Sequence, residues 1–169
     1  MYVFDAAPLI YLAKADRHSS VDELPPACVT PELVYEEVVT AGLAEGYPDA
    51  RRIERAVEDG VLDVAPVEVT ATLERLRRNE NLGDADAVVL ALASERDGTA
   101  VVDERYGRMV ADAEGIETRG TASVILRLLR EGAIDAEEVR ATIDGMIDAG
   151  RYFAPALYAK ILRKIEELG

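Results

Sequence analysis

The first residues of the chain constrain its fold more than any other stretch. Tyr2 to Phe4 is a short run with β-propensity, Asp5 follows it, and the apolar segment from Ala6 to Ala15 has helical character. In an open parallel sheet, side chains at the carboxyl ends of strands face the crevice where ligands bind. We therefore expect a central strand at the start of the chain, with Asp5 at the mouth of such a crevice.

Strand-like and helical patterns alternate along almost all of the chain. This alternation predicts an α/β fold with a central, mostly parallel sheet and helices on both faces. With 169 residues, a single domain spanning 1–169 is the simplest organisation. The predicted strands are 2–4, 27–30, 61–67, 99–102 and 116–118, and the predicted helices are 8–14, 32–40, 49–58, 70–78, 84–96, 105–114, 122–130, 136–147 and 156–168.

Two prolines refine these boundaries. Thr30 followed by Pro31 is a typical helix start, with threonine as N-cap and proline in the first turn. Pro66 lies inside the β-prone segment 61–67, and proline within a strand is confined to sheet edges or bulges. We therefore expect a helix that begins at Pro31 and a brief or edge strand before Pro66.

The charge balance is strongly acidic, with 33 acidic and 19 basic residues, of which three are lysine, and a net charge of −14. At face value this disfavours nucleic acid as a partner. However, an acidic, lysine-poor surface is also how proteins stay soluble in very salty cytoplasm, where about 1 M salt shrinks the Debye length to about 3 Å. We interpret the acidity as adaptation to salt, so it does not identify the substrate.

Cysteine usage and hydropathy indicate a cytoplasmic protein. Cys28 is the single cysteine, which excludes an internal disulfide, fits a reducing compartment and is interpreted as a buried structural thiol. No apolar run reaches the roughly 18 residues that a membrane span needs, and no secretory signal is visible. The single histidine, His18, has polar neighbours and is interpreted as a solvated loop residue.

Acidic side chains recur at the ends of predicted strands or on the helices that follow them. Each has an ordinary explanation: Asp5 or Asp103 could cap the next helix, and Asp84 resembles an N-cap. One glutamate of the pair on the second helix is expected to be a solvated surface residue. Four such positions at one edge of one sheet nevertheless favour a shared site. They are Asp5, Glu36 with Glu37, Asp84 with Asp86, and Asp103 with Glu104.

Clustered carboxylates cannot all stay ionised without a cation. Their hard oxygen ligands suit Mg²⁺ or Mn²⁺, and such ions polarise phosphoryl oxygens and activate water. One histidine and one cysteine disfavour zinc and exclude a histidine-dependent triad. The chain also lacks a glycine-rich phosphate loop. Of the reaction classes considered, metal-assisted phosphodiester chemistry is therefore the one that the acids favour.

Four segments contain these acids, in the order Val-Phe-Asp5-Ala-Ala-Pro-Leu-Ile, Thr-Pro-Glu-Leu-Val-Tyr-Glu-Glu37-Val, Leu-Gly-Asp84-Ala-Asp86-Ala-Val-Val-Leu-Ala-Leu-Ala and Val-Val-Asp103-Glu-Arg-Tyr-Gly-Arg108. In this order they resemble a PIN domain, the family of Mg²⁺-dependent ribonucleases that includes the VapC-type toxins. The C-terminal segments Gly120-Thr121 and Gly150 to Tyr158 are similar to one prokaryotic PIN subgroup, so the resemblance covers essentially the whole chain. It implies a Rossmann-like α/β/α sandwich, an RNA substrate, a small antitoxin partner and a homodimer.

The resemblance also implies roles for particular residues. Metal ligation is shared between Asp5, either Asp84 or Asp86, and Asp103, with Glu104 as a further candidate. The chain departs from toxin PIN domains in one place, because their typical Thr-x-Asp is replaced by Val101-Val102 before Asp103. The implied catalytic residues are Asp5, Glu37, Asp86 and Asp103.

Arginines near these acids are candidates for substrate binding. Arg105 and Arg108 follow Asp103 directly and could contact RNA phosphates at the mouth of the site. Two further clusters could either clamp phosphates or pair with neighbouring acids. They are Arg51, Arg52 and Arg55, and Arg75, Arg77 and Arg78.

Two other functions are compatible with the sequence. A phosphoryl-acceptor domain also has an aspartate at a strand end, but the phosphatases of that kind need a second aspartate at position 7, which is alanine. Receiver domains need a lysine late in the sheet, and the chain has none between Lys14 and Lys160. The second alternative is a non-catalytic PIN-like module that binds RNA or a partner protein.

Overall fold

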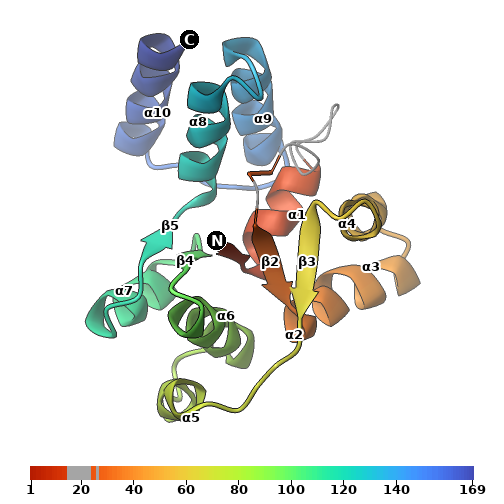
Figure 1. Cartoon of the computed structure of the whole chain (residues 1–169). Coiled ribbons are helices and arrows are strands. Elements are labelled where there is room, and N and C mark those ends of the chain that lie inside the picture. The colour runs from red at the N-terminus through yellow and green to blue at the C-terminus, as the bar shows by residue number, and fades with distance from the viewer. Residues whose placement is uncertain (15–23, 26) are drawn as a thin grey trace.

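A sheet of five parallel strands forms the centre of the molecule (Figure 1). The computed structural model describes residues 1–14, 24, 25 and 27–169, so His18 lies outside the described residues. The strand order is β3-β2-β1-β4-β5. The strands are β1 (Tyr2–Phe4), β2 (Cys28–Pro31), β3 (Leu62–Ala65), β4 (Thr99–Val101) and β5 (Thr118–Arg119).

Strand β1 is central, and the chain proceeds from it in two directions. It first adds β2 and β3 on one side and later adds β4 and β5 on the other. The order therefore reverses between β1 and β4, which is where open α/β sheets place their ligands. The N–H of Asp5 donates to the carbonyl of Val101 at 3.1 Å, so the two strand ends are joined at this reversal point.

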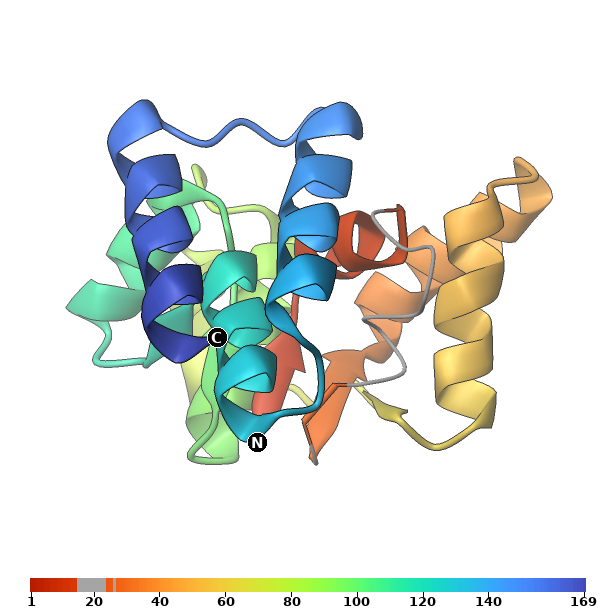
Figure 2. The same ribbon diagram turned by 90° about the horizontal axis from the view of Figure 1, so that it is seen from above.

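Helices cover both faces of the sheet, as the alternation predicted. Helix α6 packs against β1, β2 and β4 and carries α5 on its outer side, whereas α1 packs against α4 and α9. Helices α8, α9 and α10 pack on one another and lie together above the sheet in Figure 1 and at the front in Figure 2. Their bounds are α1 Ala6–Lys14, α2 Glu32–Tyr35, η1 Glu36–Thr40, α3 Ala41–Ala44, α4 Pro48–Glu58, α5 Ala71–Arg77, α6 Asp84–Glu95, α7 Arg105–Ala113, α8 Thr121–Glu131, α9 Ala136–Asp148 and α10 Pro155–Leu168.

The core explains the almost continuous apolar run of α6. Val89, Leu90 and Ala93 are fully buried because this helix lies between the sheet and α5. Cys28 is buried as well, and its thiol donates to the carbonyl of Pro25 at 3.0 Å, consistent with a structural thiol. None of the described helices combines the length and apolar character that crossing a membrane requires.

Most predicted elements are present, with ends shifted by a few residues. The segment before Pro66 is an edge strand, as predicted. Two predictions of extent were wrong: the last strand begins at Thr118, not at residue 116, and the helix after β2 continues to Ala44. That helix contains a π-helical stretch, Glu36–Thr40, which the residue pattern did not predict.

The prediction that Thr30 caps the following helix was also wrong. Thr30 is a fully buried strand residue, and its hydroxyl donates to the carbonyl of Phe4 at 3.0 Å. In the parallel ladder that begins with the N–H of Tyr2 on the carbonyl of Ala27, Phe4 would accept its bond from the N–H of residue 31. Pro31 has no N–H, so the Thr30 hydroxyl supplies the missing donor beside Asp5.

Replacing Thr30 with valine should therefore destabilise the fold. The variant keeps the β-branched shape but leaves the buried Phe4 carbonyl without this donor, which costs about 1–2 kcal/mol. Urea denaturation would measure the loss in free energy of unfolding. Thr99→Val is the matched control, because Thr99 is a half-buried strand residue whose hydroxyl has no hydrogen bond to the described residues. Equal stability of Thr30→Val and Thr99→Val would contradict the role given to this hydroxyl.

Candidate functional site

Asp5 lies where β1 turns directly into α1. Its Oδ1 accepts a hydrogen bond of 2.8 Å from the N–H of Ala6, and its own N–H is held by Val101. The residue is 8% exposed, although its side chain is a carboxyl. These contacts fix the Asp5 carboxyl at the carboxyl end of β1, beside β4.

Asp86 approaches Asp5 from the first turn of α6. The two carboxyls are close enough for each to shift the pKa of the other. Gly83, the N-cap of α6, leaves room for this arrangement, since a Cβ at that position would lie 3.0 Å from Oδ2 of Asp86. A strand and a helix that are far apart in the sequence therefore bring two carboxyls into contact.

The carboxyl pair is poorly neutralised. Burial, together with the nearby charges of Asp86 and Glu37, raises the pKa of Asp5 from 3.8 to about 7, against the opposing hydrogen bond from Ala6. Burial and the charge of Glu104 raise the pKa of Asp86, whereas hydrogen bonds from Asp5 and the backbone of Gly83 lower it. Burial is the largest cause of both shifts, so the pair as a unit retains a proton more readily than a free carboxyl does.

Two glutamates lie within electrostatic reach of this pair. Glu37 belongs to the π-helical turn after β2, a type of helix distortion that is frequent at functional sites. Glu104 is the N-cap of α7, and its Oε2 accepts a hydrogen bond of 2.8 Å from the N–H of Gly107. Glu36 is an exposed neighbour of Glu37 and does not contribute to the shifts at Asp5 or Asp86.

Asp103 follows β4, but its carboxylate is occupied by donors from the C-terminal part of the chain. Thr121 donates its N–H to Oδ1 at 2.9 Å and its hydroxyl to Oδ2 at 2.6 Å. Arg151 approaches Oδ1 at 3.4 Å, and the Asp103 side chain is only 5% exposed. Asp103 therefore anchors the start of α8 and the segment after α9 at this edge of the sheet.

Asp84 does not join the cluster, and it is not the N-cap that the sequence favoured. The N-cap of α6 is Gly83. The Asp84 carboxylate pairs with Arg77 at 2.7 Å, and its side chain is 56% exposed. Of the two aspartates that the sequence left open as a ligand, only Asp86 faces Asp5.

Some of the candidate arginines pair with surface acids, as Asp84 pairs with Arg77, and others lie nearer to the acidic cluster. Arg51, Arg75 and Arg77 pair with Glu54, Glu114 and Asp84, and Arg52 donates to the carbonyl of Ala13. The predicted pairing with neighbouring acids is therefore met by Arg51 and Arg77, whereas Arg75 pairs with an acid distant in sequence. Arg55 and Arg78 have no ion-pair partner among the described residues. Arg108 lies closer to the acids, because a Cβ on Gly120 would meet both Asp103 Oδ1 and Arg108 Nη1 within 3.6 Å. Arg105 is exposed on the first turn of α7.

A family model described as a PIN domain matches residues 1–167 of the chain. The chain belongs to the PIN-domain family. None of the curated proteins compared with the sequence gives a significant match. PIN domains are generally nucleases and typically use divalent metal ions, which accords with carboxyls gathered at the point where the strand order reverses.

The sequence interpretation missed two residues of this PIN domain that contact the cluster. Thr121 and Arg151 both bind Asp103, and Arg151 also lies over the ring of Phe153, 5.2 Å from its centroid. Nε of Arg151 is buried without a hydrogen-bond partner among the described residues. Both residues fall in the segments that carried the resemblance to the prokaryotic subgroup, but nothing in the sequence indicated that they meet Asp103.

The donor set of this PIN domain suits a hard divalent cation. A cation beside Asp5 and Asp86 would replace their shared proton and relieve their repulsion. Within residues 1–14, 24, 25 and 27–169, no three histidine, cysteine, aspartate or glutamate side chains converge as a ready-made metal site. Mg²⁺ is usually held by one or two carboxylates with waters and substrate phosphates, so a carboxyl pair is a fitting donor set.

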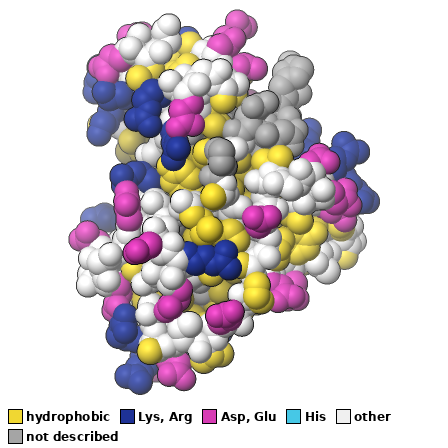
Figure 3. All heavy atoms as spheres, in the orientation of Figure 1, with side chains coloured by type: hydrophobic (Ala, Val, Ile, Leu, Met, Phe, Trp, Pro, Cys, Tyr) yellow, Lys and Arg dark blue, Asp and Glu magenta, His cyan; other side chains and the backbone are white. Residues whose placement is uncertain are grey.

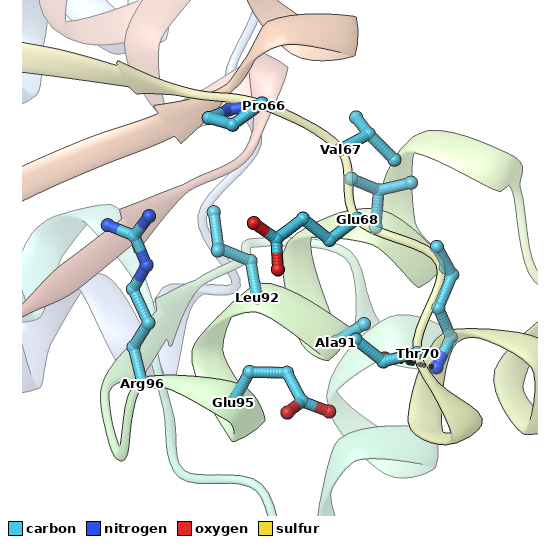
Figure 4. A pocket seen from close by; sticks show the side chains of 10 residues that line it. Pro66, Val67, Glu68, Thr70, Ala91, Leu92, Glu95 and Arg96 are labelled. Atoms are coloured by element: carbon cyan, nitrogen blue, oxygen red, sulfur yellow. Dashed lines mark hydrogen bonds between the residues drawn. The ribbon is translucent and has the colours of Figure 1, made fainter.

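A pocket of about 360 Å³ lies elsewhere in the PIN domain (Figure 4). The segment after β3 forms one wall with Pro66 and Glu68. The C-terminal half of α6 forms the other with Leu92 and Glu95, together with Arg96, the C-cap of that helix. None of its described lining residues belongs to the acidic cluster. The carboxyl cluster, not this pocket, is therefore the candidate site.

The raised pKa of Asp5 predicts a pH-dependent stability. The group is neutral in both states well below its unfolded pKa of 3.8, but between about 4 and 7 the unfolded chain loses the proton while the folded protein retains it. Without divalent ions, the free energy of unfolding should fall as pH rises through this window. The measurement is urea denaturation in EDTA across the pH range. Asp5→Asn should flatten this slope, and an unchanged slope would contradict the assignment to Asp5.

Proposed function

We propose that this PIN domain hydrolyses phosphodiester bonds of RNA with Mg²⁺ or Mn²⁺ held by Asp5 and Asp86. The observation that supports it is the carboxyl pair at the carboxyl end of β1, where the strand order reverses. Asp5 is buried, Asp86 is half-buried, and no positive charge contributes to their pKa shifts. A bound divalent ion would supply Lewis-acid activation of a phosphoryl oxygen and of water.

The remaining acids have distinct roles in this proposal. Glu37 and Glu104 accept hydrogen bonds from water molecules next to the carboxyl pair, because their charges act on Asp5 and Asp86. Asp103 positions Thr121 and Arg151 instead of binding the ion directly, since both of its oxygens already accept protein donors. Arg105 and Arg108, at the start of α7, contact the phosphates of the substrate.

We further propose the biological setting that the resemblance implies. The chain acts as a VapC-like toxin in the cytoplasm, is inhibited by a small antitoxin and forms a homodimer. The support is the order of the acidic segments, the single cysteine and the subgroup-like C-terminal segments. Size-exclusion chromatography with light scattering tests the dimer, and co-expression with the product of an adjacent small gene tests the antitoxin.

A second candidate function is a PIN-like module that binds RNA or a partner without cutting it. The observation that favours it is the pairing of Asp103 with Arg151, which neutralises a carboxylate that the family resemblance assigns to metal. Titration calorimetry with Mn²⁺ separates the two functions. Binding that depends on Asp86 supports the enzyme, whereas absence of binding supports the module.

Replacing either member of the carboxyl pair should abolish RNA cleavage. Asp5→Asn and Asp86→Asn each remove a charged oxygen ligand, and we expect losses of about 100-fold or more in kcat/KM, on the order of 3 kcal/mol of transition-state stabilisation. Cleavage of a labelled RNA in Mn²⁺ is the measurement. The matched control is Asp84→Asn, two residues away and paired with Arg77 at the surface. If Asp84→Asn lost activity and Asp86→Asn kept it, the ligand assignment would be reversed.

The same pair should bind the ion without any RNA. Because a ligand that binds only the folded state raises stability, saturating Mn²⁺ should raise the Tm of the wild-type chain by about 5 °C. Differential scanning calorimetry would record this shift in the wild type and in Asp84→Asn. The shift should be absent in Asp86→Asn. A full shift in Asp86→Asn would place the ion elsewhere in the molecule.

A further inference from the structure

A groove lined by basic side chains runs along the C-terminal helices, apart from the acidic cluster. It has a volume of about 530 Å³ and is formed by Tyr2 of β1, the end of β5, and helices α8 and α10. In Figure 3 a group of Lys and Arg side chains covers this part of the molecule, at the upper left over α8 and α10. Its cations are Arg119, Arg127, Arg130, Lys160 and Lys164.

The concentration of positive charge is out of proportion to the composition. The chain carries 33 acidic residues and a net charge of −14, yet none of the described residues that line this groove is acidic. Two of the three lysines in the chain line it. A protein that is otherwise strongly acidic therefore presents a local surface attractive to anions.

Helical spacing builds the two walls. On α8, Ser123, Arg127 and Arg130 recur at intervals of four and three residues, so they lie along one side of the helix. On α10, Lys160, Lys164 and Leu168 recur at intervals of four residues and lie along one side of that helix. The two helices pack against each other, and their stripes extend for roughly 10 Å along each axis.

Contacts with the rest of the protein hold some of these cations in place and leave others free. Arg127 pairs with Glu131 at 2.6 Å, donates to the hydroxyl of Tyr2 at 2.9 Å and lies over its ring, whereas Arg119 pairs with Glu117. By contrast, neither Arg130 nor Lys160 has an ion-pair partner among the described residues. Lys164 pairs with Glu167 at 2.5 Å. The two free charges are therefore one on each wall of the groove, Arg130 on α8 and Lys160 on α10.

One end of the groove is close in sequence to a residue that binds Asp103. Arg119 ends β5, and two residues later Thr121 donates both its N–H and its hydroxyl to Asp103. Helix α8 then runs away from this edge of the sheet, towards Arg130. An extended chain of phosphates bound at the acidic site could therefore continue past Arg119 into the groove.

We propose that this groove binds the sugar–phosphate backbone of single-stranded RNA on its way from the acidic site. The cations are spread along two helices and do not converge on one point, which suits a linear polyanion better than a single phosphate group. They line a hollow, whereas a flat membrane surface would require them on a protruding face. The identity of the polyanion rests on the proposed function, but binding in the groove is measurable without catalysis.

The test measures RNA binding by the full chain in EDTA, so that no divalent ion supports cleavage. Arg130→Gln/Lys160→Gln removes the two unpaired cations, and fluorescence anisotropy with a labelled oligouridylate gives the Kd over a series of KCl concentrations. We expect binding about tenfold weaker, and a salt dependence (log Kd against log salt) shallower by about 1.4, because each single-strand phosphate contact contributes about 0.7. Circular dichroism checks that each variant is folded at each salt concentration.

The matched control is Arg55→Gln/Arg78→Gln, which changes the net charge equally at two exposed arginines on α4 and after α5. This control should bind RNA within about twofold of the wild type. Equal losses in the two double variants, or no loss in the groove variant, would overturn the proposal. So would wild-type binding to polyglutamate or anionic vesicles without binding to RNA, since another partner would then occupy the groove.

Activity assays separate this proposal from the proposed function. With a long RNA, the groove variant should show a higher KM than the wild type and the same kcat. With an oligonucleotide too short to pass Arg119, the groove variant and the wild type should have equal kcat/KM. If the wild type cuts no RNA but the groove variant still loses binding in EDTA, the proposed function fails and the groove stands. If cleavage of long and short RNA is unaffected and binding is unchanged, the groove fails and the proposed function stands.

Discussion

The contact between Asp5 and Asp86 is the interaction on which the rest of the site depends. Two carboxyls meet at the end of the central strand, and burial, with a smaller contribution from their mutual repulsion, raises the pKa of Asp5 to about 7. Such an arrangement lowers the stability of the ion-free protein at neutral pH. In the proposed function, this loss of stability is offset when a divalent cation replaces the proton.

Asp103 connects this site to the C-terminal half of the molecule. Its carboxylate accepts both donors of Thr121 at the start of α8 and lies beside Arg151, which follows α9. The three C-terminal helices are thus tied to the edge of the sheet where β1 and β4 end. Any change in the charge of Asp103 would act on the position of α8, and with it on the basic groove that begins at Arg119.

The sequence could predict the sheet and the presence of the acidic cluster because strand ends are marked by short apolar runs followed by acids. It could not choose between Asp84 and Asp86. The two lie about 200° apart around α6. Because the helix is apolar on nearly all sides, no polar face showed which of the two aspartates points to Asp5.

The helix start at Thr30-Pro31 was predicted wrongly for a different reason, since this dipeptide suits both the start of a helix and the end of a strand. Thr121 and Arg151 were missed because their contact with Asp103 depends on the packing of distant segments. The single-domain organisation stays a prediction.

Net charge is a poor guide to the partners of this protein because the charges are segregated. The carboxyl pair of the candidate site consists of the buried Asp5 and the half-buried Asp86, whereas the cations of the groove lie on β5, α8 and α10. In concentrated salt, the electrostatic interaction between exposed charges is largely screened beyond about 3 Å. A distant acidic surface therefore does not repel a phosphate that is already in the groove. Direct contacts with arginine and lysine then decide what binds, and a chain with a net charge of −14 can still hold a polyanion.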